Sequence, residues 1–200
     1  MKKSILIIFL SIAFISGCSI VKTLTNVSRL KFKVDKIKDF NISGININNK
    51  SKITDLNITD AFTLTKAVSK GNLRADFVLN IEAKNPNDGT GGHKATDIKL
   101  KSFPFTLYID DVETVSGDIS EPITVPGVGE NQIISLNIGL DLIQFFKDKG
   151  YKGLMNLALK LGGKNSSTSS IKIVAQPVIS TFLGDIKYPD KLTIVDTKFN

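Results

Sequence analysis

The sequence has little of the chemistry from which reactive centres are usually built. Its 200 residues include one cysteine, one histidine (His93) and no tryptophan. A single cysteine excludes an intramolecular disulfide framework and a cysteine-rich metal cluster. One histidine also leaves a zinc site short of ligands, because such sites need three or four. We therefore predict no metal, no cofactor and no enzymatic activity.

Arginine is scarce as well, although the chain is basic. The net charge is +7, but Arg29 and Arg74 are the only arginines, and the lysines are scattered along the chain. Without an arginine-rich stripe or an aromatic–basic motif, we predict no nucleic-acid partner. Lysines on the outward side of strands discourage edge-to-edge pairing. The alternative interpretation is attraction to anionic lipid headgroups.

The only long apolar run lies at the N-terminus. Two lysines follow Met1, and residues 4–15 are almost entirely apolar. This run is shorter than the roughly 20 residues of a transmembrane helix and fits the apolar region of a secretory signal. Residues 15–18 (Ile-Ser-Gly-Cys) resemble the lipobox of bacterial lipoproteins. The resemblance implies cleavage before Cys18, a diacylglyceryl group on its thiol and acylation of the new amine.

These features predict three segments: a lipoprotein signal peptide (1–17), a lipidated tether (18–29) and a folded domain (30–200). Residues 19–28 are polar and rich in Ser and Thr, as expected of a flexible tether. The predicted partner is the membrane, reached through lipid on Cys18, and the predicted location is the cell envelope. Ser19 is not the aspartate of the inner-membrane retention signal, which favours an outer membrane facing the periplasm where the organism has one. The alternative is a plain signal peptide followed by an incidental cysteine.

Apolar and polar side chains alternate in three stretches between residues 73 and 138. The apolar sets are Leu73, Ala75, Phe77, Leu79, Ile81 and Ala83; Phe103, Phe105, Leu107 and Ile109; and Ile134, Leu136 and Ile138. Alternation with a period of two predicts antiparallel strands with one buried face. Asn, Pro, Gly and Asp separate the stretches, as expected of turns.

The remaining segments extend this pattern. Residues 30–48 predict strands with a bend at Ser43-Gly44, residues 53–64 a further strand, and residues 171–175, 178–183 and 192–195 short closing strands. Residues 98–110 predict one strand with Pro104 at an edge or bulge. Residues 123–129 predict a loop. The period changes over residues 141–161, which predict helices capped by Asp141 and divided at Gly150 and Gly153. About seven to nine strands with one late helical segment favour a β-sandwich.

A strand that ends in Asn85-Pro86-Asn87 resembles the late-embryogenesis-abundant type 2 family, also called the WHy (water stress and hypersensitive response) domain. Further segments follow in the family's order, namely residues 102–109, 112–117, 123–138, 141–161 and 171–184. The Gly-rich residues 88–93 depart from the family by lengthening the loop after the motif. The resemblance implies a mainly β, immunoglobulin-like antiparallel sandwich of seven strands, with a helix at one end. It also implies a structural role for Asn85, Pro86 and Asn87, and a role in stress protection or in binding partners or lipids.

Other candidate sites are few. His93 lies in the Gly-rich loop. Asp110, Asp111 and Glu113 form the densest acidic cluster, which predicts a solvated turn; the alternative is a Ca²⁺ site. The Gly127–Gly129 pair lacks the third glycine of a nucleotide-binding loop. The phenylalanines Phe77, Phe103, Phe105, Phe145 and Phe146 predict a core, with a lipid-binding groove as the alternative.

These observations predict a membrane-anchored lipoprotein that acts by binding or protecting components of the envelope. The second hypothesis is a periplasmic carrier of a hydrophobic ligand or lipid, which requires a large apolar cavity. The third is a hydrolase, which requires Asp110 and Glu113 to meet in a cleft.

Overall fold

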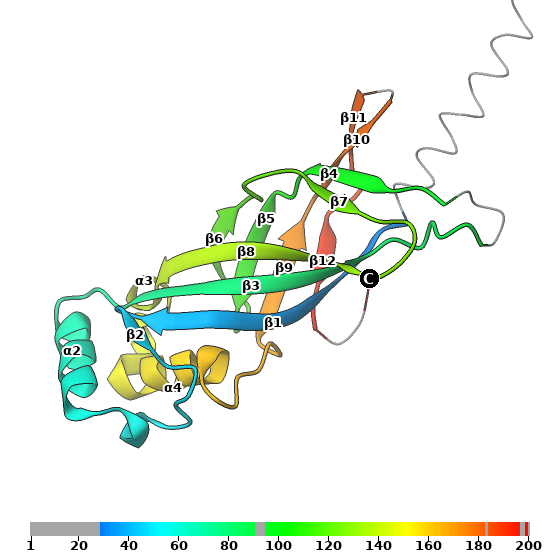
Figure 1. The fold of residues 1–200 in the computed structure, drawn as a ribbon. Helices are drawn as coiled ribbons and strands as arrows, with labels where there is room; N and C mark the ends of the chain where they lie inside the picture. The colour runs from blue at the N-terminus through cyan, green and yellow to red at the C-terminus, as the bar shows by residue number, and fades with distance from the viewer. Residues whose placement is uncertain (1–28, 91–94, 183, 197–198, 200) are drawn as a thin grey trace, which may run out of the picture.

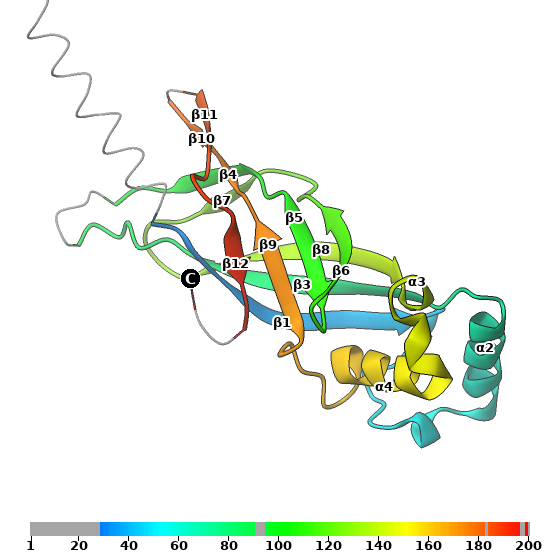
Figure 2. The same ribbon diagram turned by 180° about the vertical axis from the view of Figure 1, so that it is seen from behind.

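Two layers of antiparallel sheet face each other across an apolar core, with helices at one end (Figure 1; Figure 2). The computed structural model describes residues 29–90, 95–182, 184–196 and 199. The predicted signal peptide and most of the tether lie outside these residues. The mainly β sandwich predicted from the sequence is confirmed.

The first layer contains the three longest strands. Its order is β2-β1-β3-β8, with β1 (Lys31–Ile42), β2 (Ile45–Asn46), β3 (Arg74–Lys84) and β8 (Gln132–Asp141). β3 lies between β1 and β8 and pairs antiparallel with both. The predicted bend at Ser43-Gly44 is confirmed as the β1–β2 turn, where both residues have positive φ. Gly44 accepts this conformation without strain because it lacks a Cβ.

The second layer consists of two sheets that continue into one another. One has the order β11-β10-β4-β7 and the other β12-β9-β5-β6. The bounds are β4 (Ile98–Ser102), β5 (Phe105–Ile109), β6 (Val112–Gly117), β7 (Ile123–Val125), β9 (Ile171–Ala175), β10 (Val178–Thr181), β11 (Gly184–Lys187) and β12 (Leu192–Ile194).

A pair of prolines divides this layer. Pro104 separates β4 from β5, and Pro177 separates β9 from β10. Neither residue has an N–H for the ladder, so pairing stops at both. The two breaks face each other, since the Gln176 N–H donates to the Pro104 carbonyl (3.0 Å). The second layer is thus divided at these prolines into two four-stranded sheets, which face the three long strands of the first layer.

This arrangement corrects two details of the strand prediction. Residues 98–110 form two strands rather than one, and Pro104 lies at the break between sheets. The predicted loop at 123–129 contains β7, which pairs with β4. The described residues contain twelve strands, more than the predicted seven to nine, because residues 98–110 form two strands and because β7 and β11 were not predicted as strands.

The predicted strand at residues 53–64 is wrong. This stretch forms a short 3-10 helix, η1 (Ile53–Asp55), and most of α2 (Ile58–Ser69). The Asn57 side chain caps α2 by accepting from the Asp60 N–H (2.7 Å). Only Leu64 of α2 is buried, and Ile58 and Phe62, one helical turn apart, are 90% and 69% exposed. Residues four apart lie on one face of a helix, so Ile58 and Phe62 share an exposed face of α2. The same spacing also fits one side of a strand, which is why a strand was predicted.

The late helical segment is confirmed. It comprises α3 (Leu142–Phe146), η2 (Lys147–Lys149) and α4 (Gly150–Gly162). Asp141 is the predicted N-cap, since its Oδ1 accepts from the N–H groups of Ile143 and Leu73 (2.9 Å each). The chain breaks at Gly150, as predicted, but Gly153 lies inside α4. The predicted pair of short helices is therefore present, with the division at Gly150 and not at Gly153.

Aromatic side chains fill the space between the layers. Phe40 stacks on Phe77 with ring centroids 5.1 Å apart, and Phe32 packs against Phe103 at 5.3 Å. Of the five phenylalanines predicted to form the core, Phe77, Phe103, Phe105 and Phe146 are buried, whereas Phe145 is only partly buried. Among the described helices, none is long and apolar enough to cross a membrane.

Candidate functional site

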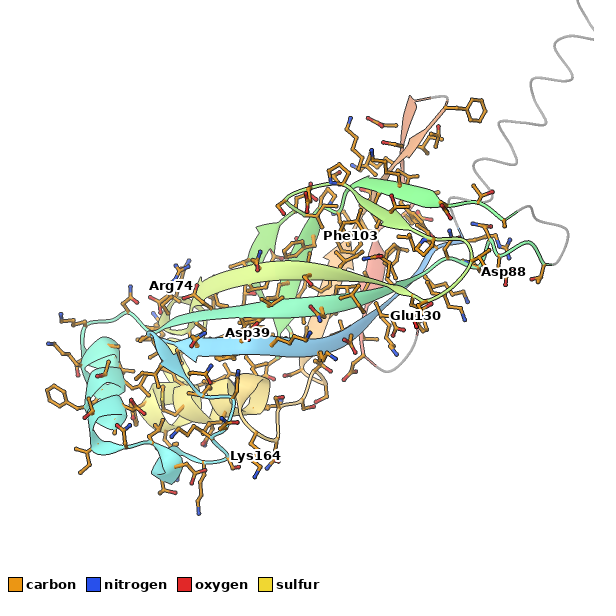
Figure 3. The ribbon with its side chains drawn as sticks, viewed as in Figure 1. Asp39, Arg74, Asp88, Phe103, Glu130 and Lys164 are labelled. Atoms are coloured by element: carbon orange, nitrogen blue, oxygen red, sulfur yellow. The ribbon has the colours of Figure 1, made fainter. Side chains whose placement is uncertain are left out.

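The candidate site lies at the end of the sandwich opposite the helices, where the described chain begins. Asp88 and Glu130 mark this end, and Lys164 marks the helical end (Figure 3). The Asn85-Pro86-Asn87 motif follows β3 here and meets the segments next to β4 and β7. The predicted motif residues meet Arg29 and Tyr188 at this end, and neither of these two was predicted to take part.

Asn85 joins three strands through one buried amide. Its Nδ2 donates to the carbonyls of Thr96 (2.8 Å) and Val125 (3.1 Å), which lie just before β4 and at the end of β7. Its Oδ1 accepts from the N–H and the side-chain amide of Asn87 (3.1 and 2.9 Å). Both amide hydrogens and the oxygen are therefore used, as a buried polar group requires. We call Asn85, Pro86 and Asn87 the clamp, because Asn85 bonds the end of β3 to the segments next to β4 and β7.

Arg29, the last residue of the predicted tether, binds to this clamp. Its Nη1 donates to Asn87 Oδ1 (3.0 Å), and its Nη2 donates to the Pro86 carbonyl (3.3 Å). Arg29 belongs to the predicted tether (residues 18–29), and these contacts were not predicted. No local pattern indicates them, because the partners lie 57 and 58 residues away.

The next residue is held from the opposite end of the chain. The buried Tyr188 hydroxyl donates to the Leu30 carbonyl (3.2 Å), and Leu30 itself is buried. Burial raises the pKa of the Tyr188 phenol, which keeps the donor protonated. The chain thus enters the domain at a fixed point, between Arg29 and β1.

Gly127 completes the site by letting its backbone approach Asn87 and Thr96 closely. A Cβ here would lie 2.6 Å from the Asn87 carbonyl oxygen and 2.7 and 2.8 Å from the Thr96 backbone. Its N–H donates to Asp97 Oδ1 (2.9 Å). A side chain would therefore not fit at Gly127, whereas Gly129 has open space around it and a positive φ of +109°.

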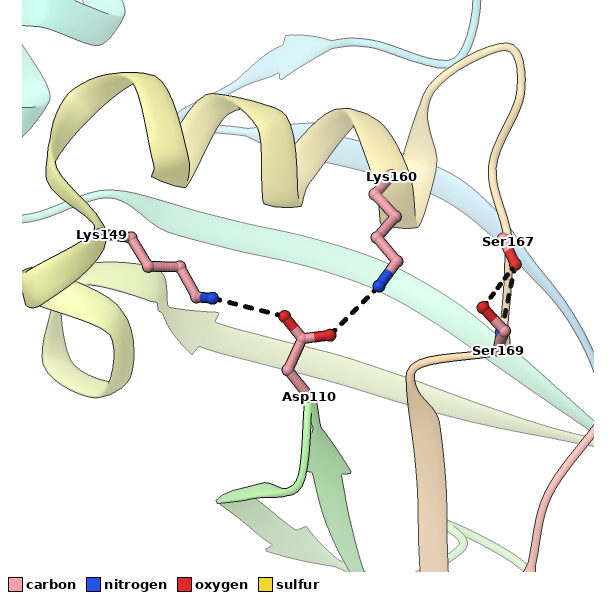
Figure 4. A network of polar contacts seen from close by, with 5 residues as sticks. All are labelled: Asp110, Lys149, Lys160, Ser167 and Ser169. Carbon is pink, nitrogen blue, oxygen red and sulfur yellow. Dashed lines mark hydrogen bonds and ion pairs between the residues drawn. The ribbon is translucent and has the colours of Figure 1, made fainter.

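The acidic cluster lies elsewhere and is divided among separate partners. Asp110 accepts from Lys149 (3.5 Å) and Lys160 (3.2 Å), so it ties the β5–β6 turn to the late helices (Figure 4). Asp111 pairs with Lys172 (3.0 Å). Glu113 accepts from the Tyr108 hydroxyl (2.9 Å), a contact that raises the pKa of that phenol. The predicted Asp110-Asp111 turn is confirmed by positive φ at both residues.

No cation site emerges from the described part of the chain. Within residues 29–90, 95–182 and 184–196 there is no group of three His, Cys, Asp or Glu side chains that could hold a metal ion. His93 and Cys18 both lie outside the described residues. The predicted lipid attachment at Cys18 therefore remains a prediction.

The surface carries shallow grooves. One, of about 350 Å³, lies where the second layer is divided and is lined by residues that include Phe105, Gly117, Gln176, Lys187 and Lys191. A second of about 350 Å³ lies over Arg74 and Asp76 on the first layer. Both are open to solvent, unlike the largely enclosing pockets that take up small hydrophobic ligands.

No protein-family model matches this chain, and no curated protein matches it. Similar solved structures include a protein from Archaeoglobus fulgidus (10% identity, 84% of this chain and 94% of that one, TM-score 0.36). They also include a putative late embryogenesis abundant protein (15% identity, 94% and 82%, TM-score 0.34). A third is a protein from Arabidopsis thaliana (11% identity, 84% and 83%, TM-score 0.32). At such low similarity we draw nothing about function from them.

Proposed function

We propose that this chain is a lipid-anchored β-sandwich protein of the cell envelope that works by binding or protecting its partners rather than by catalysis. The anchor would be lipid on Cys18, delivered by the signal-like residues 1–17. Membership of the late-embryogenesis-abundant type 2 (WHy) family and a stress-related role belong to the same proposal. They are supported by the sequence motif and its order of segments.

The observation that carries the proposal is the fixed start of the domain. Arg29 and Leu30 are held by Asn87, Pro86 and Tyr188, just where the predicted tether ends. These bonds order the first described residues. A tether that preceded them would therefore join the domain at a fixed point, as an anchored domain requires.

The polar groups singled out from the sequence make structural contacts and are not arranged as a catalytic pair. The Asn85 amide is fully used within the protein, and Asp110 and Glu113 face different partners instead of one another. A carrier would need an enclosed apolar space, and the grooves described above are open. These observations support the first hypothesis over the carrier and the hydrolase.

Metabolic labelling tests the anchor. Cells expressing the wild-type chain should incorporate labelled palmitate, and the mature N-terminus should begin at an acylated Cys18. Cys18→Ala should lose the label and accumulate as an uncleaved precursor. Ser19→Ala, which alters the neighbouring residue, should behave as wild type. Equal labelling of Cys18→Ala, or a mature wild-type protein with a free thiol, would refute the proposal.

A further inference from the structure

The β10–β11 hairpin stands out from the sandwich. It projects beyond the rest of the second layer, near the end where the described chain begins (Figure 1). Phe182 follows β10 at the turn and is 74% exposed. The turn is closed by the Thr181 hydroxyl, which donates to the Gly184 carbonyl (2.7 Å), with Gly184 at φ +107°. A large aromatic side chain is therefore held in solvent on a hydrogen-bonded support.

The base of this hairpin is bonded to the start of the domain. β11 ends at Lys187, and the next residue, Tyr188, donates to the Leu30 carbonyl (3.2 Å). Four residues of extended strand carry the turn roughly 13 Å from this base. The twelve residues from Cys18 to Leu30 span roughly 20 Å as a flexible chain. A bilayer that held Cys18 would thus lie within reach of Phe182.

The hairpin and the strand beside it carry exposed lysines. Lys99 lies opposite Ser180, and Lys187 lies opposite Val178, while Lys101 pairs with Asp185 on β11. Lys99 and Lys101 alternate with the buried Leu100, so both face outward. This partial positive charge suits the anionic headgroups of a membrane surface, and salt would weaken the attraction.

We propose that the tip of the β10–β11 hairpin is a second membrane contact, with Phe182 lying in the headgroup region of an anionic bilayer. The proposal rests on the lipid anchor of the proposed function and gives the domain a defined orientation. Lipid on Cys18 alone would leave the domain free to tumble on its tether. A rigid aromatic contact on the same side would hold the sandwich upright, with α2 directed away from the surface.

The absence of tryptophan allows a direct test. Phe182→Trp gives the mature lipidated protein a single reporter at the tip. Phe62→Trp is the matched control, because Phe62 is 69% exposed on α2 at the opposite end. Each protein would be reconstituted into vesicles of phosphatidylethanolamine and phosphatidylglycerol, with and without bromine on the acyl chains. We expect a blue shift and roughly twofold quenching by brominated lipid for Phe182→Trp only, since aromatic rings settle at the membrane interface.

Flotation of the vesicles separates the two proposals. If the proteins float but Phe182→Trp is not quenched, the anchor stands and the hairpin contact is refuted. Equal quenching of both variants would refute the upright orientation. A blue shift that arises without vesicles as protein concentration rises would assign Phe182 to a contact between copies of the chain. Wild-type protein that fails to float would overturn the anchor and the hairpin contact with it.

Discussion

At the scale of single residues, Asn85 shows how one amide can hold three strands. Its Nδ2 donates to two carbonyl oxygens, and its Oδ1 accepts from two N–H groups. Aspartate has nearly the same shape but replaces the donor with an oxygen. At this position that oxygen would face the Thr96 and Val125 carbonyls, in a place where little water can compensate.

We therefore expect Asn85→Asp to lower the free energy of unfolding by about 2–3 kcal/mol, the cost of leaving buried acceptors unpaired. Urea denaturation of the wild type and the variant measures this difference. Asn156→Asp makes the same change at an exposed position of α4 and should cost little. Equal midpoints for Asn85→Asp and the wild type would show that the clamp does not stabilise the fold.

Glu82 should make the free energy of unfolding depend on pH. It accepts from Asn131 (2.6 Å) and pairs with Lys33 (3.0 Å), and these contacts lower its pKa below the ordinary 4.5. A carboxyl group with a depressed pKa stabilises the folded state above its unfolded pKa, and this stabilisation is lost as pH falls through the folded value. Its contribution should therefore be present at pH 7 and lost in acid.

The wild type should exceed Glu82→Gln in urea midpoint at pH 7, and the gap should shrink as the pH falls below about 4. Glu121→Gln alters an exposed loop carboxylate and serves as control. A gap for Glu82→Gln that is constant from pH 7 to pH 3 would contradict this assignment.

At the scale of elements, α4 is positioned by contact with β1. Gly162, the last residue of α4, lies so close to Phe40 that a Cβ would come within 2.0–2.5 Å of the ring and its Cβ. The Phe40 side chain has no room to move away from an added methyl group, because its ring is buried and stacked on Phe77. Glycine is required here by a close approach between helix and strand.

Gly162→Ala should therefore destabilise the protein by about 1–3 kcal/mol, as overpacking does, even though alanine favours helices. Thermal unfolding followed by circular dichroism would measure the change. Lys152→Ala, on the exposed face of the same helix, should be nearly neutral. A stabilised Gly162→Ala would show that α4 can move away from β1 freely.

At the scale of the whole molecule, the clamp and α2 lie at opposite ends of the sandwich. β1 begins beside the clamp and runs for 12 residues toward the end that carries α2. At about 3.3 Å per residue this strand spans roughly 40 Å. A membrane-held domain would thus present the exposed Ile58 and Phe62 far from the bilayer.

Limited proteolysis tests where the tether ends. Trypsin should cut vesicle-bound protein readily after Lys22, in the predicted tether, and slowly after Arg29. Arg29→Lys keeps the trypsin site and the charge but loses the planar fork that binds Asn87 and Pro86. Cleavage at this position should rise roughly fivefold, as expected when a hydrogen bond worth about 1 kcal/mol is lost.

Cleavage after Lys22 is the internal control in the same sample and should not change. Mass spectrometry of the released domain identifies each cut by its new N-terminus. A wild-type domain that is released chiefly with Leu30 at its N-terminus would show that the junction is open rather than clamped.

The sequence by itself determined the features that depend on near neighbours. Alternation predicted the long strands, Asp141 predicted the start of α3, and Ser43-Gly44 predicted a turn, because a strand's two faces, a helix cap and a turn each depend on a few consecutive residues. At residues 53–64 two local signals competed. The Asn57 cap prevailed over alternation because this segment lies outside the sheets and buries little besides Leu64.

Only the tertiary structure decided the contacts that join distant parts of the chain. Pro104 meets Gln176, Asn85 meets Val125, Arg29 meets Asn87, and Leu30 meets Tyr188. Each pair is brought together when the sheets assemble. The partners are far apart in the sequence, so no local pattern indicates which residues will meet. The sequence therefore indicated the motif, whereas the fold revealed that the motif holds the start of the domain.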